Sequence, residues 1–158
     1  MDGTLCDVRS IEHLVDRSVS AQRNFYEFHS QSIDCPANPE VLAAVAAAQA
    51  DGHAVVIVSA REERWSLLTA LWLGEHGVNY ADMYMRANGD FRPDSEVKCD
   101  IAARLLKKYD ALLALDDREE LVPVWNNAGI AVRLVSPEGE LGDLRSPRLR
   151  VTVREASD

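Results

Sequence analysis

Short apolar runs alternate with longer helix-favouring segments along most of the chain. Residues 54–58 (AVVIV) and 111–115 (ALLAL) are unbroken apolar runs, and residues 83–85 and 130–135 form two further candidate strands. Apolar runs of this length without polar alternation are typical of strands that are buried on both faces of a sheet. We therefore expect strands at these four positions.

Helices are predicted between these strands. Residues 41–50 (VLAAVAAAQA) are rich in alanine, and Asn38-Pro39 before them and Gly52 after them are start and stop signals. Further helices are expected over residues 62–75, closed by Gly77, over 96–108, with Ser95 as the N-cap, and over 119–128, closed by Gly129. Strands that alternate with helices of this length form right-handed βαβ units. The predicted fold class is therefore α/β, with a parallel sheet and helices on both faces.

Two stretches lie outside this alternation. Residues 9–38 form an insert between the first polar motif and the first clear helix, with helical potential over 10–17 and 21–28. The domain is expected to span residues 1–138. Residues 139–158 are predicted to be a partly disordered C-terminal tail, in which only residues 149–153 alternate as an edge strand would.

Composition narrows the classes of function. The 158 residues include 17 Lys and Arg against 26 Asp and Glu, which gives a net charge of −9 and fits a single domain. An acidic chain is a poor sequence-independent binder of nucleic acid, because phosphate contacts need clustered Lys and Arg, although a local basic pocket escapes this argument. No apolar run approaches the ~20 residues that span a bilayer. Three scattered cysteines and the absence of a secretory signal favour a cytoplasmic protein without a membrane partner.

Polar side chains follow the predicted strands. Ser59-Ala60-Arg61 follows the first strand, Asp116-Asp117 follows residues 111–115, and the chain starts with Asp2-Gly3-Thr4 after Met1. Ligands of parallel sheets bind beyond the carboxyl ends of the strands, so these side chains are expected to share one site. Carboxylates suit Mg²⁺, which takes one or two of them together with water and substrate phosphate.

A lysine and a charged segment complete this set. Lys98 falls near the start of a predicted helix, after Arg86, Asp90 and Arg92. A lysine ammonium and a serine hydroxyl are suitable donors to a phosphoryl group that gains charge in the transition state. Each feature also has a plain structural explanation: a turn at Asp2-Gly3-Thr4, an N-cap at Ser59, a helix cap at Asp116-Asp117, and a solvated Lys98.

The order of these motifs resembles a known superfamily. MDGTLCD, VVIVSARE, the Lys98 segment and LALDDR resemble the four motifs of the haloacid dehalogenase (HAD) superfamily of phosphohydrolases. More specifically, YMRANGDFRPDSEVKCDI and ALDDREELVPVWNNAGI resemble the 3′-phosphatase domains of bacteriophage polynucleotide kinase and its bacterial relatives. The resemblance covers about residues 2–136. It implies a HAD-like fold in which residues 9–38 form a small cap.

The resemblance also implies roles for individual residues. In the D-x-D-G-T motif of the superfamily, the first Asp forms a phosphoaspartyl enzyme and the second acts as general acid and base. Asp2 matches the second Asp and Met1 matches the x, so the nucleophilic Asp is expected just upstream of Met1. The implied sites are a catalytic group of Asp2, Ser59 and Lys98, a substrate-binding group of Thr4, Arg61, Arg86, Asp90 and Arg92, and Mg²⁺ ligands at Asp2, Asp116 and Asp117.

The start of the sequence departs from the superfamily pattern. The nucleophilic Asp normally ends a central first strand, and no apolar run in residues 5–20 replaces that strand. We therefore expect a truncated first strand, neighbouring strands with unpaired backbone groups that each cost ~1–3 kcal/mol, and a chain that is inactive as given. A misassigned start, a truncation and a natural pseudoenzyme all remain open.

The implied function is that of a Mg²⁺-dependent phosphomonoesterase acting on the 3′-phosphate of a nucleic acid or a nucleotide, with an upstream kinase domain or partner. Phe25, Tyr26, Phe28 and His29 in the insert could stack on a base or pack the cap against the core. One alternative is a HAD phosphatase for a small metabolite or free nucleotide, which the acidic net charge favours. The other is a non-catalytic HAD-fold module that binds a phosphate or a partner.

Overall fold

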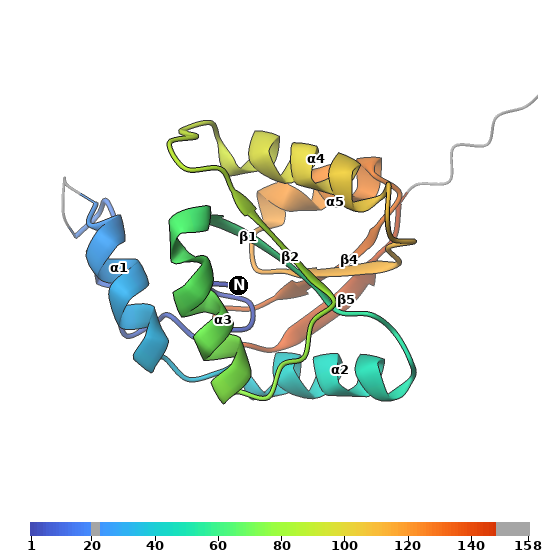
Figure 1. The fold of residues 1–158 in the computed structure, drawn as a ribbon, viewed down its shortest axis with the longest axis horizontal. Helices are drawn as coiled ribbons and strands as arrows, with labels where there is room; N and C mark the ends of the chain where they lie inside the picture. The colour runs from blue at the N-terminus through green and yellow to red at the C-terminus, as the bar shows by residue number, and fades with distance from the viewer. Residues whose placement is uncertain (20–22, 148–158) are drawn as a thin grey trace, which may run out of the picture.

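The computed structural model describes residues 1–19 and 23–147, which form an α/β fold (Figure 1). The strands are β1 (Val56–Glu62), β2 (Asp82–Arg86), β3 (Leu113–Asp116), β4 (Ala131–Val135) and β5 (Leu141–Arg145). The helices are α1 (Phe25–Gln31), α2 (Pro39–Ala50), α3 (Ser66–Glu75), α4 (Asp94–Leu105) and α5 (Val122–Asn127). The predicted alternation of strands and helices is confirmed.

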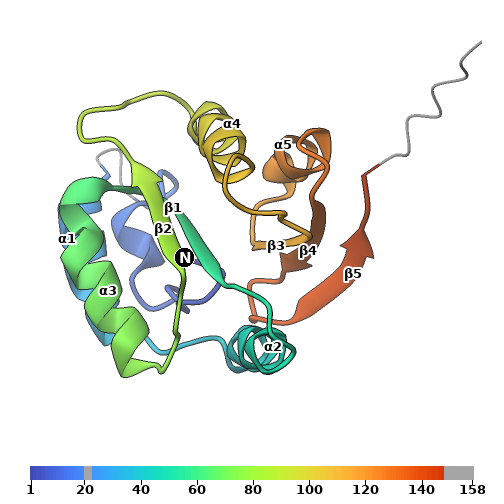
Figure 2. The same ribbon diagram turned by 45° about the vertical axis from the view of Figure 1, so that its right-hand side comes forward.

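The strands form two separate groups. β1 pairs with β2 in parallel, while β3 pairs in parallel with β4, and β5 joins the other edge of β4 in antiparallel orientation. Figure 2 shows the β1–β2 pair apart from the group of β3, β4 and β5. Within the described residues, β1 and β3 therefore each keep one edge that no other strand pairs with. The division falls where the superfamily resemblance places its central first strand.

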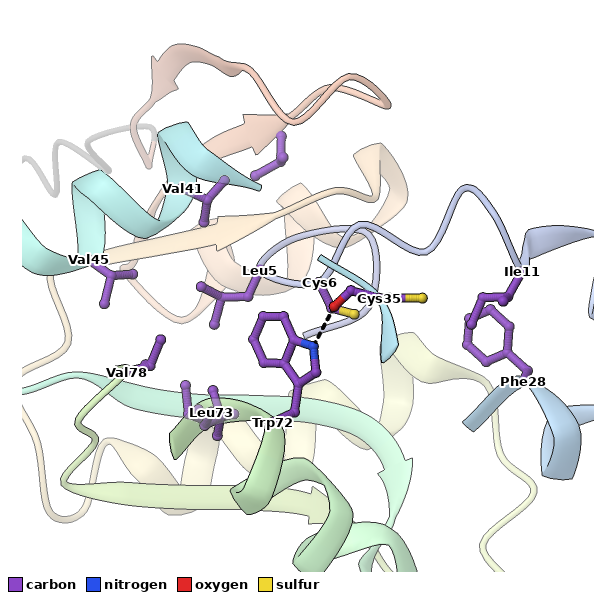
Figure 3. Close-up of a cluster of buried hydrophobic side chains, with 12 residues drawn as sticks. Leu5, Cys6, Ile11, Phe28, Cys35, Val41, Val45, Trp72, Leu73 and Val78 are labelled. Atoms are coloured by element: carbon purple, nitrogen blue, oxygen red, sulfur yellow. Dashed lines mark hydrogen bonds between the residues drawn. The ribbon is translucent and has the colours of Figure 1, made fainter. Parts of the chain in front are cut away.

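Helices cover both sides of the strands, as expected. In Figures 1 and 2, α4 and α5 lie on one side and α2 lies on the other. The apolar core is correspondingly split into two clusters. The first includes Val41 of α2 and Trp72 of α3, whose indole Nε1 donates to the Cys35 carbonyl at 2.8 Å (Figure 3). The second includes Leu105 of α4 and Trp125 of α5. Burial of each such side chain contributes about 1.5–3 kcal/mol.

Three predicted boundaries are wrong. β1 continues to Glu62, so Ser59 lies inside the strand, where it is aligned with Met85 of β2. The helix predicted over 62–75 accordingly begins later, with a 3-10 turn at Glu63–Trp65 before α3. Ser95 is not an N-cap, because the extended Pro93 (ψ 148°) precedes α4 and its carbonyl already accepts from Glu96 and Val97.

The sequence pattern did not predict β5. It lies in the segment expected to be a tail, where the N–H of Ser136 donates to the Glu140 carbonyl and the chain turns back along β4. Most of β5 is exposed, so it lacks the apolar pattern that identifies a buried strand. The edge strand predicted over residues 149–153 and the disorder predicted for the last residues lie outside the described part of the chain. None of the described helices is long and apolar enough to cross a membrane.

Candidate active site

The loop after Met1 carries the first polar motif to the end of β3. Thr4 Oγ1 donates to Asp117 Oδ1 at 2.7 Å, across 113 positions of sequence. Gly3 has a φ of +70°, a backbone conformation that side chains other than glycine rarely adopt, and a Cβ there would lie 2.4 Å from Asp117 Oδ2. The close approach of this loop to Asp117 therefore requires glycine at position 3.

Asn38 holds the same loop from the other side. Its Nδ2 donates to the Thr4 carbonyl at 2.6 Å and, at 3.4 Å, to the Gly3 carbonyl, and the residue is buried. Sequence reasoning missed this role, because an Asn before Pro is an ordinary helix start signal. In the structure, its side chain makes no capping hydrogen bond to α2. Asn38 is therefore a residue that positions the Asp2-Gly3-Thr4 motif.

Arg61 is the centre of a buried hydrogen-bond network. Its Nε donates to Asp2 Oδ2 at 2.8 Å and its Nη2 pairs with the other oxygen of Asp2, which gives a bidentate ion pair. Nη2 also donates to Ser32 Oγ at 2.9 Å, and Nη1 donates to Thr69 Oγ1 at 3.2 Å. Burial alone would raise the pKa of Asp2, but the hydrogen bonds and charge of Arg61 outweigh it and lower that pKa. Asp2 is thus held in its ionised form.

Ser59 lies next to this network. It is 3% exposed, and its Oγ accepts from the backbone N–H of Arg61 at 3.2 Å. Ser59 does not cap a helix, since Glu62 and Trp65 occupy the N-cap positions of the elements that follow β1. The alternative explanation of Ser59 as an N-cap is therefore wrong.

Lys98 and Asp116 form a second buried pair. Lys98 Nζ lies 2.7 Å from Asp116 Oδ2, and the Trp125 indole Nε1 donates to the same oxygen at 2.9 Å. Burial would raise the pKa of Asp116, but the charge and hydrogen bond of Lys98 lower it. The interpretation of Lys98 as a solvated helix residue is wrong, because Lys98 is only 8% exposed.

The two pairs converge on the start of the chain. Burial, the largest cause, and the charge of Lys98 lower the pKa of the Met1 amino group, against the opposing charges of Asp2, Asp117 and Asp116. The structure thus brings together side chains from the first loop, from α4 and from the end of β3.

The first arginine of the segment from Arg86 to Arg92 is buried and uses its guanidinium within the protein, whereas its charge suggested a contact with substrate. Arg86 is 9% exposed, and its guanidinium donates to the carbonyls of Ala60, Asp90 and Arg92 and pairs with Asp94. These contacts brace the loop against β1. The substrate contact predicted for Arg86 stays a prediction.

Arg92 is half-exposed and therefore more accessible to a ligand than Arg86 is. It pairs with the carboxylates of Asp90 and Asp100, each at 2.8 Å, and the hydrogen bonds from Arg92 lower the pKa of Asp90 to about 2. Asp90 and Arg92 also line a pocket of about 330 Å³ beside α4. Their predicted part in substrate binding likewise stays a prediction.

The carboxylates fit Mg²⁺ in type but are unequally available. The oxygens of Asp2 accept from Arg61, and Asp116 is engaged by Lys98, while Asp117 uses one oxygen for Thr4. Within residues 1–19 and 23–147, no group of three or more His, Cys, Asp or Glu side chains is close enough to hold a metal ion. Asp117 is the least committed donor of the set. The shared Mg²⁺ site of Asp2, Asp116 and Asp117 stays a prediction.

Two solved structures are similar to this fold. One is described as the structure of a Pnkp1/Rnl/Hen1 complex; it has a TM-score of 0.71 and 24% identity over 86% of this chain and 43% of that chain. The other, described as the structure of the Pnkp1/Rnl/Hen1 RNA repair complex, has a TM-score of 0.68 and 24% identity over 86% of this chain and 40% of that chain. The present chain therefore spans about two fifths of the length of these relatives. At this identity the likeness establishes the fold, which is HAD-like.

A family comparison agrees with the motifs. Residues 1–139 match the family described as the polynucleotide kinase PNKP phosphatase domain. The matched range contains every residue of the converging site, from Asp2 to Asp117, and confirms the resemblance drawn from the sequence motifs. The chain therefore belongs to the family of polynucleotide kinase PNKP phosphatase domains.

Proposed function

We propose that this chain is the phosphatase domain of a Mg²⁺-dependent enzyme that removes the 3′-phosphate from a nucleic acid or a nucleotide. The observation that carries this proposal is that the Thr4–Asp117 hydrogen bond and the Lys98–Asp116 pair bring the Asp2-Gly3-Thr4 motif, α4 and the end of β3 together. Membership of the PNKP phosphatase family supports a polynucleotide substrate. A phosphorylated nucleic-acid end and a kinase domain, on the same or a partner chain, are the proposed partners.

The proposed nucleophile is an aspartate directly before Met1, two positions before Asp2. Its carboxylate would lie beside Lys98, whose positive charge stabilises both the nucleophile and the phosphoryl oxygens. The carboxylate oxygen attacks phosphorus, the bond from phosphorus to the 3′-oxygen breaks, and a phosphoaspartate forms. Water then cleaves the acyl phosphate, which regenerates the carboxylate and releases inorganic phosphate.

Asp2 supplies the general acid and base of this proposal. It protonates the departing 3′-oxygen and later accepts a proton from the attacking water. Because Arg61 holds Asp2 ionised, Asp2 gains its proton once the hydrogen bonds of Arg61 pass to the substrate phosphate. The hydroxyl group of Ser59, next to Arg61, is proposed to donate a hydrogen bond to the phosphoryl oxygens. Asp117, together with Asp2 and Asp116, would hold Mg²⁺, and the bound ion would neutralise negative charge on the phosphoryl oxygens.

The small cap is consistent with a large substrate. The segment between Asp2 and α2 contains only α1 and two 3-10 turns, Glu12–Leu14 and Ser32–Asp34, among its described residues. A cap of this size leaves more room over the centre than a domain-sized cap would. This feature favours a nucleic-acid end over a small metabolite.

The test uses a chain extended at its N-terminus by about four apolar residues and an Asp directly before Met1. The matched control carries Asn in place of that Asp. Phosphate release is measured on oligonucleotides with a 3′- or a 5′-phosphate and on sugar phosphates. We expect release from the 3′-phosphate to be fastest, and the Asn control to be at least about 10³-fold slower.

Other outcomes identify the alternatives. Faster release from sugar phosphates would favour the small-metabolite phosphatase. An extended Asp form that releases no phosphate would favour the non-catalytic module. The in-frame codon before Met1 is also expected to encode Asp, and a stop codon or a polar residue other than Asp at that position would count against the proposed nucleophile.

A further inference from the structure

Aromatic rings from the cap and from the turn before α3 form one connected group, which we call the aromatic platform. Its members are Phe25, Tyr26, His29 and Trp65. The ring centroids of Tyr26 and Trp65 are 5.4 Å apart, edge to face, and those of His29 and Trp65 are also 5.4 Å apart. The Phe25 ring stacks with His29 at 6.2 Å. These separations are typical of favourable aromatic pairs.

The aromatic residues of the cap divide into two kinds. Phe28 is buried beside Ile11 in the first core cluster (Figure 3), so it packs the cap against the core. Tyr26 is 72% exposed and Phe25 is 49% exposed. Packing of the cap against the core therefore explains Phe28, whereas Phe25 and Tyr26 keep much of their surface exposed beyond their contacts with His29 and Trp65. A contiguous group of exposed apolar rings is a feature of interaction sites, whereas single exposed apolar side chains are common on any surface.

Two hydroxyl groups link the platform to Arg61. Ser32 Oγ accepts from Arg61 and donates to the His29 carbonyl at 2.7 Å. Thr69 Oγ1 accepts from Arg61 and donates to the Trp65 carbonyl at 2.9 Å. The two residues that meet at the centre of the platform are thus fixed to the same guanidinium.

This linkage limits the distance between the platform and the proposed catalytic centre. Three hydrogen bonds in series, each of about 3 Å, connect the Asp2 carboxylate to the backbone of His29 or of Trp65. On the His29 route the bonds share Arg61 Nη2 and Ser32 Oγ, so the His29 carbonyl lies within roughly 9 Å of that carboxylate. On the Trp65 route the bond to Thr69 leaves from Nη1, so the width of the guanidinium is added and the Trp65 carbonyl lies within roughly 11 Å. A nucleotide whose 3′-phosphate contacts Asp2 and Arg61 carries its base within this reach.

Two further observations fit an aromatic ligand. The Nδ1 atom of His29 is buried and has no hydrogen-bond partner among the described residues. Burial lowers the pKa of His29 to about 4, so the ring is neutral near pH 7. The Arg23 guanidinium lies 5.7 Å from the centroid of Phe25, which places a positive charge at the edge of the platform. A neutral stacking surface beside a cation matches a base with its adjoining phosphodiester.

We propose that the aromatic platform is a base-stacking subsite for the terminal nucleotide of the substrate. The proposal rests on the proposed function, because it assumes that a 3′-phosphate occupies the centre at Asp2 and Arg61. Stacking is tolerant of sequence, since every base has a flat face. The platform would therefore select nucleotides over sugar phosphates without selecting one base.

Binding measurements on the chain as it stands test this proposal. A dinucleotide 3′-phosphate, the same compound without its terminal base, and inorganic phosphate are titrated by calorimetry. We expect the intact dinucleotide to bind about 5- to 100-fold more tightly than the abasic compound. Tyr26→Ala should abolish most of that difference, Trp65→Phe should retain it, and Tyr80→Ala, which removes an exposed aromatic side chain outside the platform, should not change it.

A second signal comes from tryptophan emission. Trp72 and Trp125 are buried, whereas Trp65 is partly exposed, so a stacked base should quench Trp65 and the quenching should disappear in Trp65→Phe. Equal affinities for the intact and abasic compounds, or a silent Tyr26→Ala, would overturn the platform and leave the proposed function standing if both compounds still bind. A chain that binds no phosphate ligand at all would count against both.

Discussion

Arg61 and Asp2 lie 59 positions apart in the sequence and form a bidentate ion pair in which the arginine side chain is 1% exposed. The same guanidinium reaches the cap through Ser32 and α3 through Thr69. One side chain thus joins the first loop, the cap and the helix after β1. The position of the proposed acid and base depends on this junction.

Replacement of Arg61 is expected to destabilise the protein strongly. Arg61→Gln leaves Asp2 without its charged partner in a largely buried place, and loss of one member of a buried pair costs about 3–5 kcal/mol. Arg64→Gln is the matched control, because Arg64 pairs with Glu62 but is 62% exposed, and such a pair contributes about 0–1 kcal/mol. Urea denaturation measures both. Similar losses in the two variants would show that burial of the Arg61 pair has no energetic consequence.

A methyl group at position 3 is expected to disturb Asp117. Gly3→Ala forces a non-glycine residue to a φ of +70° and places its Cβ 2.4 Å from Asp117 Oδ2. The control Gly52→Ala imposes a similar φ of +84° with no atom within 4 Å. Backbone strain costs about 1–2 kcal/mol in each variant, and only Gly3→Ala adds a steric clash. Thermal denaturation should show the larger loss for Gly3→Ala, and equal losses would refute the close approach.

Folding stability is expected to decrease on acidification because of His29. Burial, the largest cause, and the charges of Arg61 and Arg64 lower its pKa, against the opposing charges of Asp2 and Glu62, to about 4. An unfolded histidine has a pKa of about 6.5, so between about pH 6.5 and pH 4 the unfolded chain binds a proton that the folded chain does not. Folding stability is therefore lost as the pH falls through this range, by on the order of 2 kcal/mol.

Substitution of His29 checks this pH dependence. His29→Phe should flatten the curve of unfolding free energy between pH 6.5 and pH 4, because the titrating group is gone. His53→Phe, which removes an exposed histidine, should leave the curve as it is. An unchanged slope in His29→Phe would mean that other groups cause the pH dependence.

Substitution of Arg86 is expected to lower stability, whereas substitution of Arg92 is expected to lower activity. Arg86→Lys removes several of the hydrogen bonds that brace the loop, and lysine cannot reproduce the fork, so we expect a loss of about 3–5 kcal/mol in stability. Arg92→Ala breaks only exposed pairs and should change stability by less than about 1 kcal/mol. In the extended chain, however, Arg92→Ala should slow release of the 3′-phosphate. A silent Arg92→Ala would remove this residue from the substrate site.

Mg²⁺ binding should depend most on Asp117. Asp116 is committed to Lys98 and Trp125, while Asp117 has an oxygen without a protein donor among the described contacts. Calorimetric titration of the extended chain should therefore show at least a tenfold loss of affinity in Asp117→Asn, about 1.4 kcal/mol. Asp110→Asn, at an exposed position near β3, is the control. Equal affinities in the wild type and Asp117→Asn would show that Asp117 only positions Thr4.

The sequence by itself determined the order of the elements and the family. Unbroken apolar runs and start and stop signals act over a few residues, so β1, β2, α2 and the alternation of strands with helices follow from local pattern. The motifs around Asp2, Lys98 and Asp116 were also readable, because each is a short string next to a strand or helix. The family match over residues 1–139 agrees with that prediction.

Only the tertiary structure decided which polar groups meet. The contacts of Arg61 with Asp2, Asn38 with Thr4, and Lys98 with Asp116 join residues 18 to 59 positions apart, and no local pattern specifies such pairs. The exposed β5 escaped prediction because its register comes from backbone pairing with β4 and not from burial. Which polar groups pair in a buried site depends on which strand ends and loops the fold brings together. A charge that is removed from water is costly unless an opposite charge lies beside it.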